Sequence, residues 1–362
     1  MVRADPGRPG LLYAGTQRAV YVSFDDGESW QSLSLNLPTT WMRDLLPHQG
    51  DLLLATQGRG LWVLDDVAPL REASPALARE AARLFAPAPA VRLRGSESHD
   101  TPWPPETSLG ENPPAGAMLD YWLRESTAAP VTLTITDSAG AVVRRFSSRD
   151  APESLGVKPY FEQAWVGTPR AVSAAAGMHR FVWDLRYPRP VAPGYNYSIA
   201  AVRHDGTPVE PLGALVLPGR YTVTLAAAGV TQSRLLDVRL DPRVEVGAEA
   251  LRAQFELTQS AIATLERAMA ASRRISGARA TRTRTLPPAL VDSLAALDGG
   301  EGGGLVATSR SLSRLVRELQ AADAAPPQGI VDAMAECTRR IDSLLTRWRR
   351  LEASIAGTSK GR

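Results

Sequence analysis

Several residue types that usually carry chemistry are scarce in this sequence. Its 362 residues include one cysteine, and the only lysines are Lys158 and Lys360. A single cysteine cannot form an internal disulfide, so burial alone must hold the fold together. The histidines lack the spacing of metal ligands, and we predict no metal site. They are His48, His99, His179 and His204.

Long apolar runs and a large net charge are also missing. No stretch approaches eighteen consecutive apolar residues, and the first residues show no charged region followed by an apolar core. We therefore expect neither a membrane span nor a signal peptide in this chain. The net charge is only +3. We attribute the many arginines to genomic base composition, because a phosphate-binding surface requires clustered basic residues, and we predict no nucleic-acid partner.

The sequence contains no recognisable motif for a reaction. It has no Gly-x-Ser-x-Gly nucleophile elbow, and the glycines of 299–304 are not followed by the Lys-Ser/Thr pair of a phosphate-binding loop. A glycosidase needs two carboxylates that face one sugar. The acidic pairs Asp25-Asp26 and Asp65-Asp66 are adjacent in sequence, so on extended chain their side chains point to opposite faces. We predict no catalytic residue and no cofactor.

Residues 1–70 contain short apolar segments separated by turn residues, which is typical of an antiparallel meander. Between two of these segments the sequence reads Ser-Phe-Asp-Asp-Gly-Glu-Ser-Trp. We expect the Asp25 carboxylate to accept backbone N–H bonds of the turn, Gly27 to supply a positive φ, and Trp30 to pack back on the sheet. The apolar segments are 11–15, 19–22, 30–33, 51–56 and 60–64.

This turn resembles the Asp-box, whose pattern Ser-x-Asp-x-Gly-x-Ser/Thr-Trp is met by Ser23, Asp25, Gly27, Ser29 and Trp30. Residues 56–66 are similar to the closing strand of bacterial propellers of the sialidase-like and sortilin-like repeat class. The resemblance implies that residues 1–70 are the terminal blades of a β-propeller, of which they supply at most about one and a half. An open ring would leave strand edges and apolar faces in water, so we expect the missing blades to come from upstream sequence or from a partner chain.

The same resemblance implies a secreted or periplasmic location. Sialidases of this class use an arginine triad with a Tyr/Glu pair and a further acid, which cannot be placed on this sequence. Sortilin-like members hold an extended peptide within the ring. Arg59, the propeller arginine near the end of the ring, and Trp103, an aromatic residue in a Pro-rich loop, are candidate ligand contacts, although a structural role is favoured for each.

Residues 71–115 are expected to form a connector with a short helix and a Pro-rich extended segment. Alternation then predicts about seven strands over 116–243, which is typical of an immunoglobulin-like β-sandwich. The Trp-Asp-Leu-Arg element at 183–186 and the Pro-Gly-x-Tyr-x-Val-x-Leu element at 218–225 resemble the small sandwich domain of the flagellar hook-capping family and of many secreted bacterial enzymes. The resemblance implies an accessory module.

Residues 244–362 carry helical periodicity. Over 330–355 apolar residues recur in alternating steps of four and three, which is an unbroken heptad seam. Cys337 falls on that seam as a small core residue. Matching runs over 251–269 and 305–319 predict an antiparallel helical hairpin or a three-helix bundle. Self-association through the last helix is the alternative.

The expected fold class is therefore mainly β with a helical C-terminal region. We predict a non-catalytic structural and interaction region of a larger β-propeller protein, with a protein, a peptide or a glycan as its partner. Two alternatives stay open: a fragment of a sialidase-like glycoside hydrolase, and a peptide-binding propeller resembling sortilin.

Overall fold

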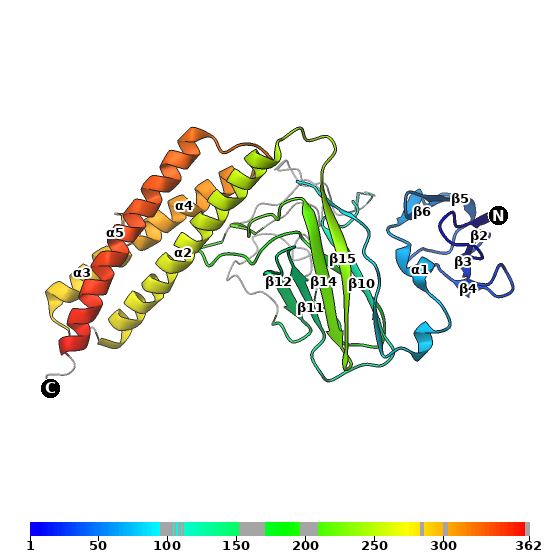
Figure 1. The fold of residues 1–362 in the computed structure, drawn as a ribbon, viewed down its shortest axis with the longest axis horizontal. Coiled ribbons are helices and arrows are strands. Elements are labelled where there is room, and N and C mark those ends of the chain that lie inside the picture. The colour runs from blue at the N-terminus through cyan, green and yellow to red at the C-terminus, as the bar shows by residue number, and fades with distance from the viewer. Residues whose placement is uncertain are drawn as a thin grey trace.

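A computed structural model describes residues 1–94, 104, 106–107, 110, 112–151, 171–195, 209–282, 286–299 and 303–358. Within these residues the chain is mainly β, followed by a helical C-terminal region. Three parts follow one another in space as they do in sequence (Figure 1). Two small sheets of four and three strands form the N-terminal part, sheets of three and five strands form the middle part, and helices form the C-terminal part.

The N-terminal part consists of two antiparallel sheets, with the strand orders β1-β2-β3-β4 and β5-β6-β7. The facing sides of the two sheets share one apolar core that includes Tyr13 and Leu52. Gly15 permits their close approach, because a Cβ there would lie 2.9 Å from the Cβ of Met42. The strands are β1 (Val2–Ala4), β2 (Leu12–Gly15), β3 (Val20–Ser23), β4 (Gln31–Ser32), β5 (Met42–His48), β6 (Asp51–Thr56) and β7 (Leu61–Leu64).

The middle part follows a short helix, α1 (Ala68–Glu72), and a 3-10 turn at Leu77–Arg79. Its two sheets have the strand orders β13-β10-β8 and β12-β11-β14-β15-β9. They share one core, in which Trp183 and Tyr121 are almost fully buried. The strands are β8 (Ala82–Leu84), β9 (Ala90–Arg92), β10 (Ala117–Leu123), β11 (Thr132–Thr136), β12 (Val142–Ser147), β13 (Gly177–Trp183), β14 (Gly219–Ala227) and β15 (Val230–Leu240).

Residues 71–115, which we expected to be a connector, thus contribute a strand to each sheet of the middle part. β8 pairs with β10 in one sheet, and β9 runs parallel to β15 in the other. Ala82 and Leu84 of β8 are buried in the shared core. The middle part therefore begins before residue 116.

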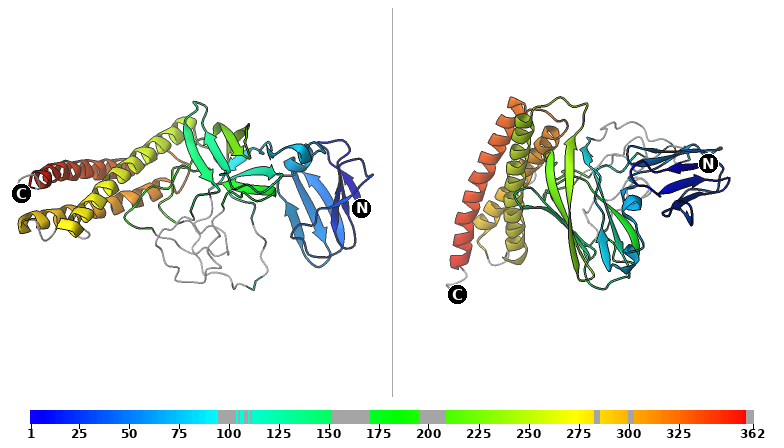
Figure 2. Two further views of the ribbon diagram at one scale, coloured as in Figure 1. Left: turned by 90° about the horizontal axis from the view of Figure 1, so that it is seen from below. Right: turned by 45° about the vertical axis from the view of Figure 1, so that its right-hand side comes forward.

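Four helices pack around one apolar core in the C-terminal part. α2 contacts the other three helices, and α5 contacts α3 and α4. Figures 1 and 2 show α2 and α5 running alongside each other. Cys337 is half-buried against this core. None of the helices in the described residues combines the length and apolarity that crossing a bilayer requires. They are α2 (Ala248–Arg282), α3 (Pro288–Asp298), α4 (Leu305–Leu319) and α5 (Gln328–Thr358).

Candidate functional site

The turn between β3 and β4 carries the residues that resemble an Asp-box. The Asp25 carboxylate accepts the backbone N–H of Ser29 at 2.9 Å and the hydroxyls of Ser29 and Ser23 at 2.5 and 2.8 Å. Gly27 has a φ of 96°, and its N–H donates to Ser23 Oγ at 2.9 Å. Trp30 Nε1 donates to the Gly27 carbonyl oxygen at 3.0 Å. Both partners of each bond lie within the turn, so the arrangement fastens a hairpin.

The electrostatics of Asp25 agree with a structural role. The Ser29 hydroxyl, then the Ser29 backbone N–H and the Ser23 hydroxyl, lower the pKa of Asp25 to about 2. The carboxylate is therefore ionised throughout the physiological pH range and cannot serve there as a general acid.

Of the two candidate ligand contacts, the structure describes only Arg59, because Trp103 lies outside the described residues. Arg59 is exposed in the turn between β6 and β7. Its carbonyl oxygen accepts the Nε1–H of Trp62 at 2.9 Å. The backbone of Arg59 thus takes part in the hairpin turn, and its side chain is exposed to solvent.

The described residues contain no group of three or more His, Cys, Asp or Glu side chains that could hold a metal ion. His179 is half-buried on β13, where its ring lies 5.1 Å from that of Tyr121 and its Nε2 lies 2.7 Å from the carbonyl oxygen of Ala175. Burial raises the pKa of the Cys337 thiol. A thiol held in that state is a poor nucleophile at neutral pH.

The acidic residues after β7 lie at the joint between the N-terminal and middle parts. Arg180 of β13 donates to the carbonyl oxygens of Asp65 and Asp66 at 2.7 and 3.0 Å. It also forms a bidentate pair with Asp120 of β10, at 2.9 and 2.7 Å. One guanidinium thus connects the end of the small sheets to the middle part.

Asp66 has a φ of 51°, so the chain is not extended at this point and the sequence argument for separating the Asp65 and Asp66 side chains does not hold there. The Asp66 carboxylate accepts the N–H of Ala68 at 3.0 Å, at the start of α1. Burial raises the pKa of both acids, and the nearby Asp51 raises that of Asp65 further. Asp66 is buried, so a raised pKa here does not create an accessible acid pair.

A second joint connects the middle part to the helices. Asp323, between α4 and α5, accepts Arg92 Nη2 at 2.8 Å and Arg94 Nε at 2.7 Å. Arg92 and Asp323 side chains are only 2% and 3% exposed. Arg94 also donates to the carbonyl oxygen of Gln320, whose Oε1 accepts Arg186 Nη1 at 3.0 Å. The middle part and the segment between α4 and α5 are therefore connected by a buried network of polar side chains.

The outer face of the β5-β6-β7 sheet carries an exposed apolar row, with the polar residues Asp44 and His48 on either side of it. The pairing register aligns Leu46, Leu53 and Val63 in one row across the three strands. Leu61 lies on the same face, two residues before Val63. Leu61 is 83% exposed, and Leu46 and Val63 are each 52% exposed. An exposed row of large aliphatic side chains on a sheet marks a surface for another element.

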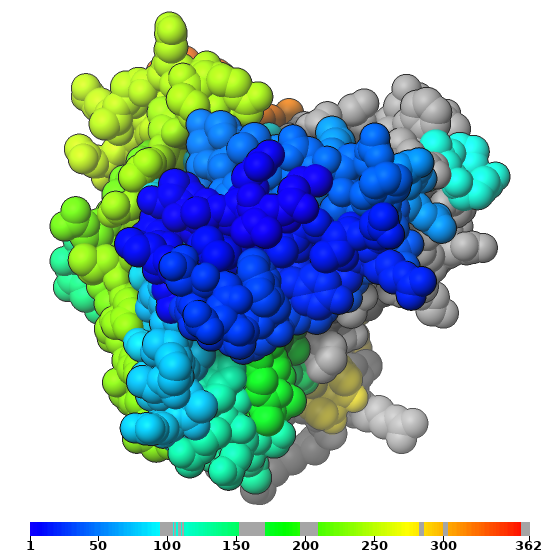
Figure 3. All heavy atoms as spheres, turned by 90° about the vertical axis from the view of Figure 1, so that its right-hand side faces the viewer, coloured from blue at the N-terminus to red at the C-terminus, as the bar shows by residue number. Residues whose placement is uncertain are grey.

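The opposite outer face, on the β1-β2-β3-β4 sheet, is apolar in part. The register places Val2, Ala14, Tyr21 and the exposed Ser32 in one row, with Ala4, Leu12 and Ser23 in the next. Val2 is 52% exposed. Figure 3 looks onto this end of the molecule, where residues 1–70, in blue, lie nearest the viewer. The two small sheets are thus packed together on one side each, and each carries exposed apolar side chains on the other.

Comparison with known proteins gives no relative on which to base a function: no protein-family model, curated protein or solved structure matches this chain.

Proposed function

We propose that this chain is a non-catalytic interaction region whose first two sheets are blades of an Asp-box β-propeller. Both outer faces of this pair receive further sheets of the same kind, supplied by the same polypeptide or by a partner chain. On this proposal the middle part is an immunoglobulin-like sandwich. The helices are a three-helix bundle in which the two shorter helices, α3 and α4, together take the place of one helix. These two parts are the scaffold on which the blades are mounted.

The apolar outer faces carry the proposal. Burying a large aliphatic side chain contributes about 1.5–3 kcal/mol, so covering three exposed side chains of this kind would add several kcal/mol of hydrophobic stabilisation. They are Leu46, Leu61 and Val63. The existing interface between the two sheets indicates what kind of surface would cover them, because its inner faces meet through a core made mainly of large apolar side chains.

The local structure supports the same proposal. The turn that resembles an Asp-box closes on itself through the hydrogen bonds of Asp25 with Ser23 and Ser29. Arg180 anchors the end of the sheet pair to β10 and β13. The sheets are therefore fastened at their edges, while their broad faces are left for packing.

Sedimentation velocity over a concentration series tests the proposal. Because an open face that takes a sheet of its own kind can also take a second copy, we expect the full chain to self-associate as concentration rises. Replacing Leu61 and Val63 together by serine should remove that association. Leu235→Ser is the matched control, because Leu235 is a 60% exposed leucine on β15, outside the small sheets. It should leave the association unchanged.

A chain that stays monomeric at all concentrations, with the amides of β7 fully protected from hydrogen exchange, would contradict the proposal. If the Leu235→Ser control loses association to the same extent, the self-association contact includes the middle part and is not specific to the small sheets. Hydrolysis of a sialoside by the purified chain would overturn its non-catalytic part and favour the glycoside hydrolase alternative. If a longer product of the same gene is monomeric, the missing sheets belong to the same polypeptide.

A further inference from the structure

We propose that one end of the small sheets, formed by residues 16–19, 40–43 and 57–60, binds an acidic peptide segment of a partner protein. We call this surface the basic end. It belongs to the part of the molecule farthest from the helices (Figure 1). The proposal does not depend on the packing of further sheets on the outer faces. Three exposed arginines and one exposed tryptophan lie at the basic end: Arg18, Arg43, Arg59 and Trp41.

Hydrogen bonds connect the three segments of the basic end. The N–H of Met42 donates to the carbonyl oxygen of Thr16 at 2.9 Å, and the N–H of Gln57 donates to that of Trp41 at 2.9 Å. The Thr40 hydroxyl donates to the carbonyl oxygen of Gln57 at 3.0 Å. The exposed arginine in each of the two turns lies two residues from one of the first two bonds. The basic end is therefore one connected surface that is fixed before a partner arrives, which lowers the cost of binding.

The segments that form the basic end carry no acidic residue. The sequence has no Asp or Glu within 12–24, 29–43 or 52–64. The acid that follows Arg43 is Asp44, which pairs with Arg3 at 3.1 Å. None of the three arginines of the basic end forms an ion pair with a described residue. Their guanidinium groups therefore keep N–H donors for the carboxylates of a partner.

Most acidic residues of the small sheets lie at the opposite ends of the strands. β3 runs from the basic end toward the turn that begins after Ser23, β6 starts at the opposite end, and β7 leads to that end. A strand of four residues spans about 13 Å, which exceeds the Debye length of about 8 Å at physiological ionic strength. These acids therefore neutralise the basic end only weakly. They are Asp5, Asp25, Asp26, Glu28, Asp51, Asp65 and Asp66.

Trp41 gives the basic end an apolar contact. It is 44% exposed, and the guanidinium carbon of Arg43 lies 4.6 Å from the centre of its ring. This cation–π contact holds the two side chains together. Tryptophan and arginine are also the residue types that most often carry the binding energy of protein interfaces. The ring can therefore pack against the backbone and aliphatic carbons of a peptide whose carboxylates reach the arginines.

The polar groups favour an acidic peptide over a neutral glycan. A sugar hydroxyl needs acceptors as well as donors, whereas a guanidinium only donates. The hydroxyls of Thr16 and Thr40 already donate to backbone carbonyl oxygens, at 2.9 and 3.0 Å. The side-chain oxygen of Gln57 accepts Arg43 Nη1 at 3.4 Å. The basic end thus offers mainly donors, which match carboxylates.

The length of the partner segment follows from the packing of the sheets. Arg18 lies in a turn of one sheet and Arg59 in a turn of the other. Packed sheets lie about 10 Å apart, and an extended chain covers about 3.3 Å per residue. A segment of about eight acidic residues therefore reaches both turns with residues to spare.

Fluorescence anisotropy of a labelled octaglutamate peptide, titrated with the full chain, tests the proposal. Octaglutamine is the matched probe, because it has the same length without the charge. We expect octaglutamate to bind saturably and about tenfold or more tightly than octaglutamine, and to weaken as salt is added. A sulfated oligosaccharide of similar charge is the competing probe. If it binds more tightly than octaglutamate and responds to the same substitutions, the surface is a glycan site and the peptide proposal is wrong.

Replacing Arg18 and Arg59 together by glutamine should weaken the binding of octaglutamate about tenfold or more. The matched control replaces Arg145 and Arg239, two exposed arginines of the middle part, by glutamine. It changes the net charge equally and should alter binding less than about twofold. Circular dichroism establishes that both variants are folded. Equal losses in the two variants, or equal binding of the two peptides, would overturn the proposal.

Trp41→Ala separates the apolar contact from the charge. We expect it to weaken octaglutamate binding while the salt dependence stays that of the native chain, because the arginines remain. If Trp41→Ala binds octaglutamate as tightly as the native chain, the ring takes no part and the proposed contact with the peptide backbone is wrong.

Discussion

Replacing Asp323 by alanine should strongly destabilise the contact between the middle part and the helices. Asp323 is the acceptor shared by Arg92 and Arg94, and it is almost fully buried. Among the described residues, Arg92 makes its only hydrogen bond to Asp323, since its Nε and Nη1 atoms have no partner. The substitution therefore leaves a buried guanidinium with neither a counter-charge nor an acceptor.

The magnitude follows from that burial. Removing one partner of a buried ion pair costs about 3–5 kcal/mol, because the remaining charge stays desolvated. Arg94 retains the Gln320 carbonyl oxygen and Gln254 Oε1 as acceptors, so the cost arises mainly at Arg92. Asp323→Asn should lie between alanine and the native residue, because the amide oxygen can still accept.

Urea unfolding followed by circular dichroism measures the change. Glu336→Ala is the control, because Glu336 pairs with Arg339 on an exposed face of α5, where an ion pair contributes about 0.2–1 kcal/mol. The free energy of unfolding should fall by several kcal/mol in Asp323→Ala and by less than about 1 kcal/mol in the control. If both variants lose the same small amount, the buried network does not hold the two parts together.

Three further predictions follow from single residues. The pKa of about 2 at Asp25 lies below its ordinary value of 3.8, so the ionised carboxylate stabilises the fold above pH 3.8, and this stabilisation is lost as the pH falls toward 2. In Asp25→Ala, the loss of stability between pH 3.8 and 2 should be absent from an acid titration followed by tryptophan fluorescence. The raised pKa of Asp65 has the opposite sign, so stability falls as the pH rises above 3.8; Asp65→Asn should be the more stable protein at pH 7 in thermal melts, and a lower melting temperature would refute this. Gly213→Ala should cost about 1–3 kcal/mol by overpacking in urea titrations, whereas Gly194→Ala, where the added methyl meets open space, should be nearly neutral.

Strands in which apolar and polar residues alternate could be predicted from the sequence. Strands whose position depends on pairing with other strands could not. Runs such as 132–136 and 219–225 alternate and lie in β11 and β14. β5 contains Asp44 and Pro47, which break the pattern, yet it pairs with β6 at the edge of its sheet. An edge position tolerates proline, because one side of the strand needs no hydrogen bonds.

The short strands β8 and β9 were not predicted, for a related reason. Each has three residues, and β9 follows a Pro-rich segment. Their positions are set by partners far along the chain, as the pairing of Arg92 with Leu240 shows. The buried ion pair of Arg92 spans 231 positions to Asp323. No local pattern signals an arginine that is buried by a contact of that separation, so the joints between the parts could not be predicted from sequence.

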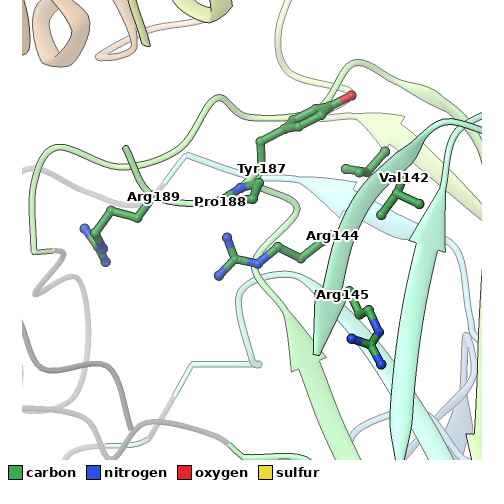
Figure 4. Close-up of a pocket in the computed structure, with 7 residues that line it drawn as sticks. Val142, Arg144, Arg145, Tyr187, Pro188 and Arg189 are labelled. Carbon is green, nitrogen blue, oxygen red and sulfur yellow. The ribbon is translucent and has the colours of Figure 1, made fainter. Parts of the chain in front are cut away.

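The helical seams were predictable because each pairs with similar seams nearby. Leu265, Leu312 and Ile341 come from the three predicted runs and are fully buried in one core. The Asp-box turn was predictable for a different reason, since its contacts all lie within a few residues of Asp25. A surface hollow beside β12 is lined by both Arg144 and Arg189, which are 45 positions apart in the chain and which no local pattern could have placed together (Figure 4).

The raised pKa values of this chain bear on the glycoside hydrolase alternative. A general acid needs a raised pKa together with a path for its proton to a bound ligand. Asp65 and Asp66 meet only the first condition, because Arg180 holds their backbone against Asp120 and the Asp66 side chain is buried against α1. Their raised pKa values are consequences of burial where two parts of the chain meet. Buried or half-buried ion pairs thus lie at both joints of the molecule, whereas exposed aliphatic side chains lie on the outer faces of its small sheets. This distribution supports the proposed interaction role.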